Sequence, residues 1–194
     1  MDADNACPLR TALVVLGAGA GSRFVGPTHK LRAIVRGRTV LSWSIEAALR
    51  SEVGPLAVVS RDDSLADLIP VGVTLLRNER WSEGIATSLQ VAVQWAKGFG
   101  ADALVVGLGD QPFVGAQSWR AVAGATQRPI AIATYGASRR NPVRLAASVW
   151  PLLPSAGDEG ARSLIREHPN MVSELPCEGE PGDIDTVEDL QTWS

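Results

Sequence analysis

The chain has very little cysteine and histidine, two of each in 194 residues. Cys7 and Cys177 are far apart and form no C-x-x-C pair. The spacing of a zinc site or of a disulfide framework is therefore missing, and two reduced thiols are the simpler expectation. His29 and His168 form no metal pair either. No Ser-His-Asp or Cys-His grouping is apparent, which disfavours covalent nucleophilic catalysis.

The chain also lacks a long apolar run and an excess of positive charge. With Asp2 and Asp4 at its start, we expect no signal peptide, no membrane anchor and a cytoplasmic location. The formal net charge of −3 argues against non-specific nucleic-acid binding. Residues 1–50 hold seven Lys and Arg against three Asp and Glu, whereas residues 151–194 hold two against ten. The basic part suits phosphate binding, and the acidic part suits metal binding or solubility.

Short apolar runs recur along the chain, with helical patterns between them. This alternation predicts a single α/β domain over residues 1–194, with a mostly parallel sheet and an N-terminal tail at residues 1–10. The predicted strands are Ala12–Leu16, Leu56–Ser60, Val73–Arg77, Ala103–Leu108 and Ile130–Thr134. The predicted helices are Thr39–Arg50, with Leu41, Ile45, Ala48 and Leu49 on one face, and Ile85–Lys97.

Ligands of open α/β sheets lie outside the carboxyl ends of the strands. This rule nominates four segments that follow predicted strands, namely Gly17–Lys30, Ser60–Asp63, Asn78–Gly84 and Gly109–Val114.

The first of these segments is a glycine-rich turn with two cations. Gly17, Gly19 and Gly21 leave backbone N–H groups free to face an anion, and Arg23 and Lys30 add full charges. The glycines alone would equally well turn a strand into a helix. The two cations favour a phosphate cradle, and the expected ligand is a nucleoside polyphosphate.

Two better-known glycine loops do not fit this segment. A Walker A loop needs Gly-Lys-Ser/Thr, but Ser22 and Arg23 follow Gly21. A dinucleotide fingerprint would place its third glycine at Ser22, and no acidic residue closes a second strand about 20 residues later. His29, beside Lys30, is expected to be an exposed loop residue.

Carboxylates form a second group of candidate functional residues, after the glycine-rich turn. Asp110 follows a predicted strand, where its oxygens could meet a bound triphosphate through Mg²⁺, although Gly-Asp-Gln-Pro is equally good turn chemistry. Near the C-terminus, Asp183 and Asp185 alternate about an isoleucine as a short strand would, which points them to opposite faces. Thr186 is expected to cap the last helix, with Asp189 at the capping-box position.

Together these segments resemble the molybdenum-cofactor nucleotidyltransferase family, in particular its cytidylyltransferase branch. L-G-A-G-A-G-S-R with Lys30 is similar to that family's L-A-A-G-x-S-x-R…K opening, and N-E-R-W-S-E-G-I-A-T-S-L to its N-x-x-W-x-x-G-x-x-x-S-L segment. G-D-Q-P, R-N-P-V, G-D-E-G-A-R and D-I-D-T-V-E-D-L also resemble its motifs, in the same order. The resemblance runs nearly end to end.

The resemblance implies a three-layer α/β/α, Rossmann-like nucleotidyltransferase fold with a mixed sheet. It also implies Mg²⁺-dependent transfer of a nucleotidyl group from CTP or GTP to a phosphorylated acceptor of the molybdopterin type, with release of pyrophosphate. Arg23, Lys30 and Asp110 would be catalytic, and Asp110 and Asp185 would ligate the metal. The implied nucleotide-binding residues are Leu16, Gly17, Ala18, Gly19, Gly21, Ser22, Arg23, Lys30, Asn78, Gly84, Ser88 and Asp110. The implied acceptor-binding residues are Gln111, Pro112, Asn141, Pro142, Asp158 and Gly160, and the Gly157–Arg162 loop would border the acceptor.

Three departures from the family pattern leave the acceptor open. Gly17 replaces an alanine, one extra residue lies between Arg23 and Lys30, and Arg140 replaces the glycine before Asn-Pro. A phospho-acid or a sugar phosphate is therefore an alternative acceptor. Ala18 stands where the cytidylyl branch carries alanine and the guanylyl branch glycine, which favours CTP. A carrier without turnover, delivering the cofactor to a molybdoenzyme or its maturation chaperone, is a further alternative.

Overall fold

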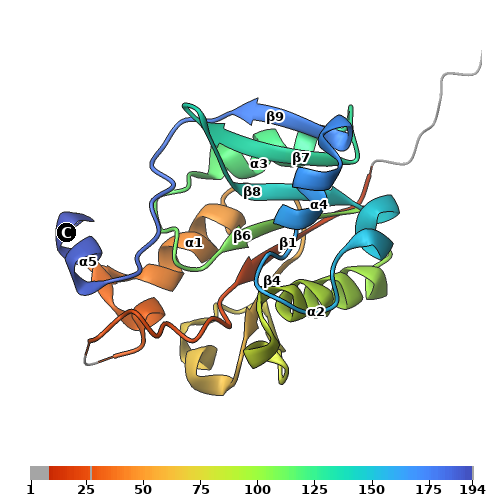
Figure 1. Ribbon diagram of the computed structural model, residues 1–194. Coiled ribbons are helices and arrows are strands. Elements are labelled where there is room, and N and C mark those ends of the chain that lie inside the picture. The colour runs from red at the N-terminus through yellow and green to blue at the C-terminus, as the bar shows by residue number, and fades with distance from the viewer. Residues whose placement is uncertain (1–8, 27, 194) are drawn as a thin grey trace, which may run out of the picture.

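The computed structural model describes residues 9–26 and 28–193 of the chain. Its centre is a seven-stranded sheet (Figure 1) in the order β5-β4-β1-β6-β8-β7-β9. Strand β8 runs antiparallel to β6 and β7, and the other pairings in this sheet are parallel. The strands are β1 (Thr11–Leu16), β4 (Leu56–Ser60), β5 (Thr74–Arg77), β6 (Ala103–Leu108), β7 (Ile130–Tyr135), β8 (Ser138–Ala146) and β9 (Val172–Pro176), and a separate antiparallel pair is formed by β2 (Ile34–Val35) and β3 (Arg38–Thr39).

Helices cover both faces of the sheet (Figure 1). One face packs against α1 (Val40–Leu49) and α3 (Ala116–Gly124). The last helix, α5 (Val187–Trp193), lies beside α1 and contacts β2. The other face packs against α2 (Ile85–Gly98), α4 (Arg162–Glu167) and the 3₁₀ helix η4 (Ala147–Leu152). This is the predicted three-layer α/β/α architecture. No described helix is long and apolar enough to cross a membrane.

The strands are continuous apolar runs because they are buried on both faces. In β1, Leu13 and Val15 belong to the core beneath α1 and α3, whereas Val14 and Leu16 belong to the core beneath α2. All of these side chains are nearly or fully buried. The alternation of side chains along one strand thus supplies both cores.

All five predicted strands and both predicted helices are present. Strands β4 and β6 coincide with their predicted ranges, and Thr39 and Arg50 are the caps of α1. The prediction that Leu49 lies on the apolar face of α1 is wrong, since Leu49 is 43% exposed and the buried face runs through Val40 and Ser44 instead. Strands β8 and β9 are not among the predicted strands, because Arg and Glu interrupt their apolar pattern.

The segment at 183–185, expected to resemble a short strand, is not one. It has no strand pairing and is held by one backbone hydrogen bond, in which Ile184 N donates to Asp110 O at 2.9 Å. The predicted capping box of α5 is present. Thr186 Oγ1 accepts from Asp189 N at 3.1 Å, and Asp189 Oδ2 accepts from Thr186 N at 2.8 Å.

Two sequence expectations concern the cysteines and the start of the chain. Cys7 and most of the predicted tail at residues 1–10 lie outside the described residues. Cys177 is a free, half-buried thiol.

Close packing of α3 on the sheet depends on a glycine in β6. A Cβ added at Gly107 would lie 2.4 Å from an indole carbon of Trp119, which is closer than real Cβ contacts. Trp119 is 2% exposed and packs on β6 from α3. The absence of a side chain at Gly107 therefore lets the indole lie directly on the strand.

We expect Gly107→Ala to lower the melting temperature, because the indole of Trp119 would have to move within a packed core. Overpacking of this kind costs about 1–3 kcal/mol, which corresponds to roughly 2–12 °C for a chain of this size. The measurement is thermal unfolding, with Gly124→Ala in α3 as the matched control, since nothing lies within 4 Å of an added Cβ there. Equal melting temperatures for the two variants would contradict the packing argument.

Candidate active site

The parallel strands β1, β4, β5 and β6 end at the same edge of the sheet, and two adjoining cavities lie there. We call the first the loop cavity; it has a volume of about 430 Å³ and is bordered by the glycine-rich loop, Lys30, Asp110 and the segment around Trp81. We call the second the arginine cavity; it has a volume of about 450 Å³ and is bordered by the starts of β8 and α4. Their shared walls are Leu16, Ile85, Leu108 and Asp158.

The structure brings most of the predicted nucleotide-binding residues to the loop cavity. Three of the four nominated segments contribute to its lining, and Ser60–Asp63 does not. The predicted residues that line it are Leu16, Gly17, Ala18, Gly19, Ser22, Lys30, Gly84, Ser88 and Asp110. Those that do not line it are Gly21, Arg23 and Asn78.

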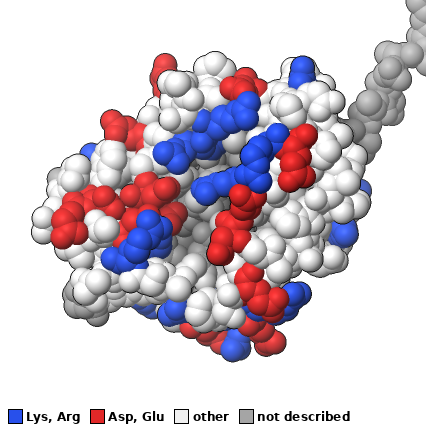
Figure 2. All heavy atoms as spheres, in the orientation of Figure 1, with Lys and Arg blue, Asp and Glu red and all other residues white. Residues whose placement is uncertain are grey.

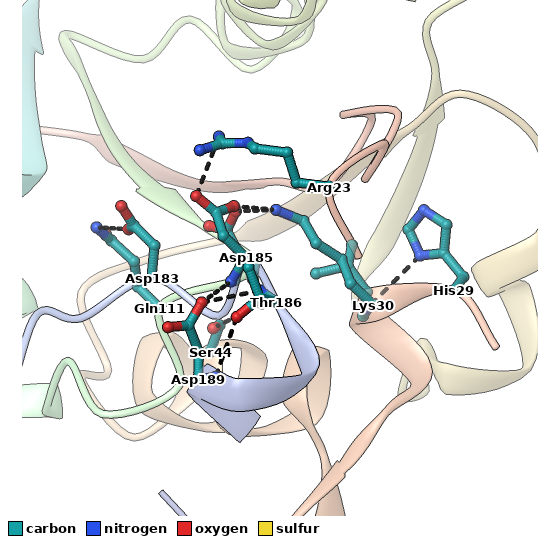
Figure 3. Close-up of polar contacts among 12 residues, drawn as sticks. Arg23, His29, Lys30, Ser44, Gln111, Asp183, Asp185, Thr186 and Asp189 are labelled. Carbon is teal, nitrogen blue, oxygen red and sulfur yellow. Dashed lines mark hydrogen bonds and ion pairs between the residues drawn. The ribbon is translucent and has the colours of Figure 1, made fainter. Parts of the chain in front are cut away.

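Four charged side chains form a chain of ion pairs beside the loop cavity, and Figure 3 labels Arg23, Lys30 and Asp185 among them. Lys30 Nζ lies 2.6 Å from Asp110 Oδ2 and 3.1 Å from Asp185 Oδ1, and so bridges the two carboxylates. Arg23 reaches the other oxygen of Asp185, with its Nη2 3.0 Å from Oδ2. The side chains of Lys30, Asp110 and Asp185 are 10%, 20% and 25% exposed, whereas Arg23 is 76% exposed. Three of the four side chains are therefore largely buried, and Arg23 is the exposed cation of the cluster.

This cluster sets the charge state of the lysine. Burial alone would lower the pKa of Lys30, but the charges and hydrogen bonds of Asp110 and Asp185 outweigh burial and raise the pKa above its ordinary value. Lys30 is therefore an ammonium throughout the physiological pH range. The extra residue between Arg23 and Lys30, a segment in which Pro27 lies outside the described residues, does not keep Lys30 from the carboxylates.

The carboxylates of Asp110 and Asp185 supply part of the ligand set of a divalent cation. Asp110 Oδ1 is buried and has no hydrogen-bond partner in the described part of the chain. Among these residues no three or more His, Cys, Asp or Glu side chains form a metal-binding group. Mg²⁺ accepts such a sparse set, since it uses one or two carboxylates and completes its octahedron with phosphate oxygens and water. The predicted ligands Asp110 and Asp185 thus suit a metal that arrives with a polyphosphate.

Asn78 has a structural position rather than a place on the cavity wall. It is 1% exposed, and its Nδ2 donates to Thr87 Oγ1 and to Ser88 Oγ, both at 2.9 Å. Its Oδ1 accepts from Arg80 N at 3.0 Å. Asn78 thereby ties the end of β5 to the first turn of α2 and positions Ser88, which lines the loop cavity.

Gly84 lets two loops meet between the cavities. Its φ is +102°, and an added Cβ would lie 2.3 Å from the carbonyl of Gly157. Gly157 N donates to Glu83 O at 2.7 Å, and Gly157 O accepts from Ala86 N at 3.0 Å. This contact holds Asp158 on the wall that both cavities share.

Of the predicted acceptor-binding residues, four line the arginine cavity and two do not. Gln111, Asn141, Asp158 and Gly160 line the arginine cavity, whereas Pro142 is buried and does not. Pro112 is buried too and faces a different groove, beside α1 and α3.

Two predictions for individual side chains are wrong. Asp183 does not point away from the site, because its Oδ1 accepts from Gln111 Nε2 at 2.7 Å at the edge of the cluster (Figure 3). The cause is that residues 183–185 form no strand, so strand alternation does not apply. His29 is half-buried rather than exposed, and its Nδ1 accepts from Leu31 N at 3.3 Å.

The structure also adds residues that the sequence argument missed. Trp81, 36% exposed, lines the loop cavity, with the Arg61 guanidinium 5.6 Å from the centre of its ring. Arg139 and Arg166 line the arginine cavity together with Arg140 and with Arg162, which ends the G-D-E-G-A-R loop expected to border the acceptor. The signal for Arg139 was its place beside Arg140, and the signal for Arg166 was its four-residue spacing from Arg162, which places both on one side of a helix.

The fold is that of the nucleotidyltransferase class of α/β proteins. A model of the MobA-like NTP transferase domain matches residues 13–172. The chain therefore belongs to the MobA-like NTP transferase family, as the sequence motifs predicted.

Relatives with different names match the chain over nearly its whole length. Purine catabolism protein PucB of Bacillus subtilis is 29% identical over 191 residues, which cover 91% of this chain and 92% of that protein. Molybdenum cofactor guanylyltransferase of Cereibacter sphaeroides is 28% identical over 189 residues, with the same coverage. The crystal structure of Rv0371c from Mycobacterium tuberculosis has a TM-score of 0.82 and 26% identity, covering 95% of this chain and 97% of that chain.

The environment of Asp183 generates a prediction about pH. Burial, the largest influence, raises the pKa of its carboxyl, and the hydrogen bond from Gln111 opposes it. Because the folded pKa lies above the unfolded one, the stabilising contribution of this group is complete below the unfolded pKa and is lost as pH rises through the folded pKa. At pH 7 the ionised carboxylate is therefore unfavourable.

We expect Asp183→Asn to raise the melting temperature of the metal-free protein at pH 7 by up to a few degrees. The gain in melting temperature should be smaller near pH 4. Asparagine keeps an oxygen for Gln111 but carries no charge to bury. Thermal unfolding at the two pH values measures this, with Asp63→Asn at an exposed position as control. A melting temperature at pH 7 below that of the control would refute the interpretation.

Proposed function

We propose that the protein is a Mg²⁺-dependent nucleotidyltransferase that moves a nucleotidyl group, CMP from CTP by preference, to a phosphorylated acceptor of the molybdopterin type and releases pyrophosphate. One observation carries the proposal. Asp110 and Asp185 are held together by Lys30 where a glycine-lined cavity adjoins a second cavity. Two cavities that share a wall suit two substrates that must meet.

The roles of the chain's own residues follow from their places. Exposed Arg23, and Lys30 at the wall of the loop cavity, would neutralise the triphosphate. Asp110 and Asp185 would hold the metal, which supplies charge neutralisation across the phosphates when bound. An acceptor phosphate is already an ionised nucleophile, so no general base is needed. Rate enhancement then comes from in-line positioning and charge neutralisation.

Lys30 would have two roles in this scheme. Without ligands its ammonium balances the two carboxylates, which otherwise would repel each other close to the buried oxygen of Asp110. When Asp110 and Asp185 hold a divalent cation, the ammonium of Lys30 would be available to the phosphates. A structure of Rv0371c in complex with manganese supports a divalent metal for a protein of this fold.

We expect Asp110→Asn and Asp185→Asn each to lower the transfer rate by about 10²–10³, since each removes one carboxylate charge from the proposed metal site. The measurement is pyrophosphate release with Mg²⁺ and molybdopterin as acceptor. Asp63→Asn, an exposed carboxylate outside both cavities, is the control. Wild-type rates for both site variants would eliminate the metal assignment.

The preference for CTP rests on Ala18. Ala18 is 4% exposed and lines the loop cavity. By the family resemblance, its methyl group narrows the slot in which the base lies, which disfavours the larger purine. A relative named molybdenum cofactor guanylyltransferase makes GTP the second candidate donor.

We expect Mg²⁺ with CTP to raise the melting temperature more than Mg²⁺ with GTP at equal concentration. A ligand at about 100 times its dissociation constant stabilises by roughly 2.7 kcal/mol, or about 5–10 °C for a chain of this size. Ala18→Gly should favour GTP relative to CTP by about tenfold. A larger shift with GTP in the wild-type protein would instead support a guanylyltransferase.

A further inference from the structure

Four arginines surround the arginine cavity. Arg139 and Arg140 come from the start of β8, and Arg162 and Arg166 come from α4. Figure 2 shows Lys and Arg side chains gathered over these elements beside a hollow, with acidic side chains next to them. Some of the positive charge is therefore neutralised within the protein, and the question is which guanidinium groups remain available.

Two of the four arginines are already paired. Arg139 donates to Glu174 Oε1 from Nε at 3.0 Å and from Nη2 at 2.5 Å. Arg166 forms a two-pronged pair with Glu159, with distances of 3.0 and 2.7 Å. These pairs fix the rim of the cavity and leave little net charge at their positions.

The other two arginines, Arg140 and Arg162, are exposed and form no hydrogen bond or ion pair with any described residue. Their charges act on acidic groups without direct contact, that of Arg140 on Asp183 and that of Arg162 on Glu159. The wall behind them is apolar and includes Val106, Leu108 and Ile132. An apolar wall with two unpaired guanidinium groups suits an organic molecule with an apolar or planar body and an anionic group.

The anionic group that Arg140 and Arg162 suit differs from the acceptor phosphate that reacts with the nucleotide. The reacting phosphate must approach the nucleotide at Lys30 and Asp110, which line the loop cavity and not the arginine cavity. Arg140 and Arg162 line the arginine cavity and not the loop cavity. Each cavity thus has its own cations.

We infer that Arg140 and Arg162 bind a second anionic group of the acceptor, distinct from the phosphate that receives the nucleotidyl group. The acceptor would lie with its body on the apolar wall, its reacting phosphate toward Lys30 and its second anionic group, which in a molybdopterin-type acceptor is the dithiolene, on the two arginines. This inference rests on the proposed function, and it makes Arg140 and Arg162 specificity-determining residues.

The test uses two fluorescent probes with similar aromatic bodies. 8-Anilinonaphthalene-1-sulfonate carries an anion, and N-phenyl-1-naphthylamine does not. Arg140→Gln and Arg162→Gln should each weaken binding of the sulfonate probe to the full-length protein by about tenfold or more, with binding of the neutral probe unchanged. Arg139→Gln and Arg166→Gln, the paired arginines, are the matched controls and should have smaller effects.

A second arm separates this inference from the proposed function. Saturating Mg²⁺ and CTP should leave the sulfonate probe bound, and Arg140→Gln and Arg162→Gln should leave the CTP thermal shift unchanged. Displacement of the probe by CTP, equal effects of all four variants, or equal binding of both probes would overturn the inference. If CTP fails to bind the wild-type protein at all, the proposed function fails, while the probe comparison still reports on the arginines.

Discussion

A buried ammonium between two carboxylates is the interaction on which the candidate site depends. Asp110 follows β6 and Asp185 precedes α5, 75 residues further along the chain, yet both lie within about 3 Å of Lys30 Nζ. Three hydrogen bonds join the described parts of the C-terminal segment and the Asp110 loop: Ile184 N donates to Asp110 O, and Gln111 Nε2 donates to Pro181 O and to Asp183 Oδ1. The ion pairs, the fully buried Ile184 side chain and the capping box at Thr186 together place the second carboxylate.

The sheet makes this convergence possible. Because β1, β4, β5 and β6 are parallel, the segments that follow them meet at one edge, where the glycine-rich loop, the Trp81 segment and the Asp110 loop enclose one cavity. Strand β8 enters in the opposite direction, so its beginning, with Arg139 and Arg140, lies at this same edge. The reversed strand therefore adds cations to a site that is otherwise built by strand ends.

Much of the fold was predictable because its strands are buried on both faces and appear as apolar runs. Strands β8 and β9 were not predictable in this way, since R-R-N-P-V-R and V-S-E-L-P carry polar residues at the edge of the site and of the sheet. Motif resemblance indicated Lys30, Asp110 and Asp185, and the structure places them in contact. It could not show that Asn78 is enclosed by Thr87 and Ser88, that Asp183 bonds to Gln111, or which arginines are unpaired, because those facts depend on packing between distant segments.

The proposed reaction transfers a nucleotidyl group, rather than a terminal phosphoryl group, at the Lys30–Asp110–Asp185 cluster. The most direct test follows the label from CTP that carries ³²P at the α-phosphate and, separately, at the γ-phosphate, with Mg²⁺ and molybdopterin. We expect the α-label in the acceptor and the γ-label in pyrophosphate. A γ-label in the acceptor, or in free orthophosphate, would contradict nucleotidyl transfer.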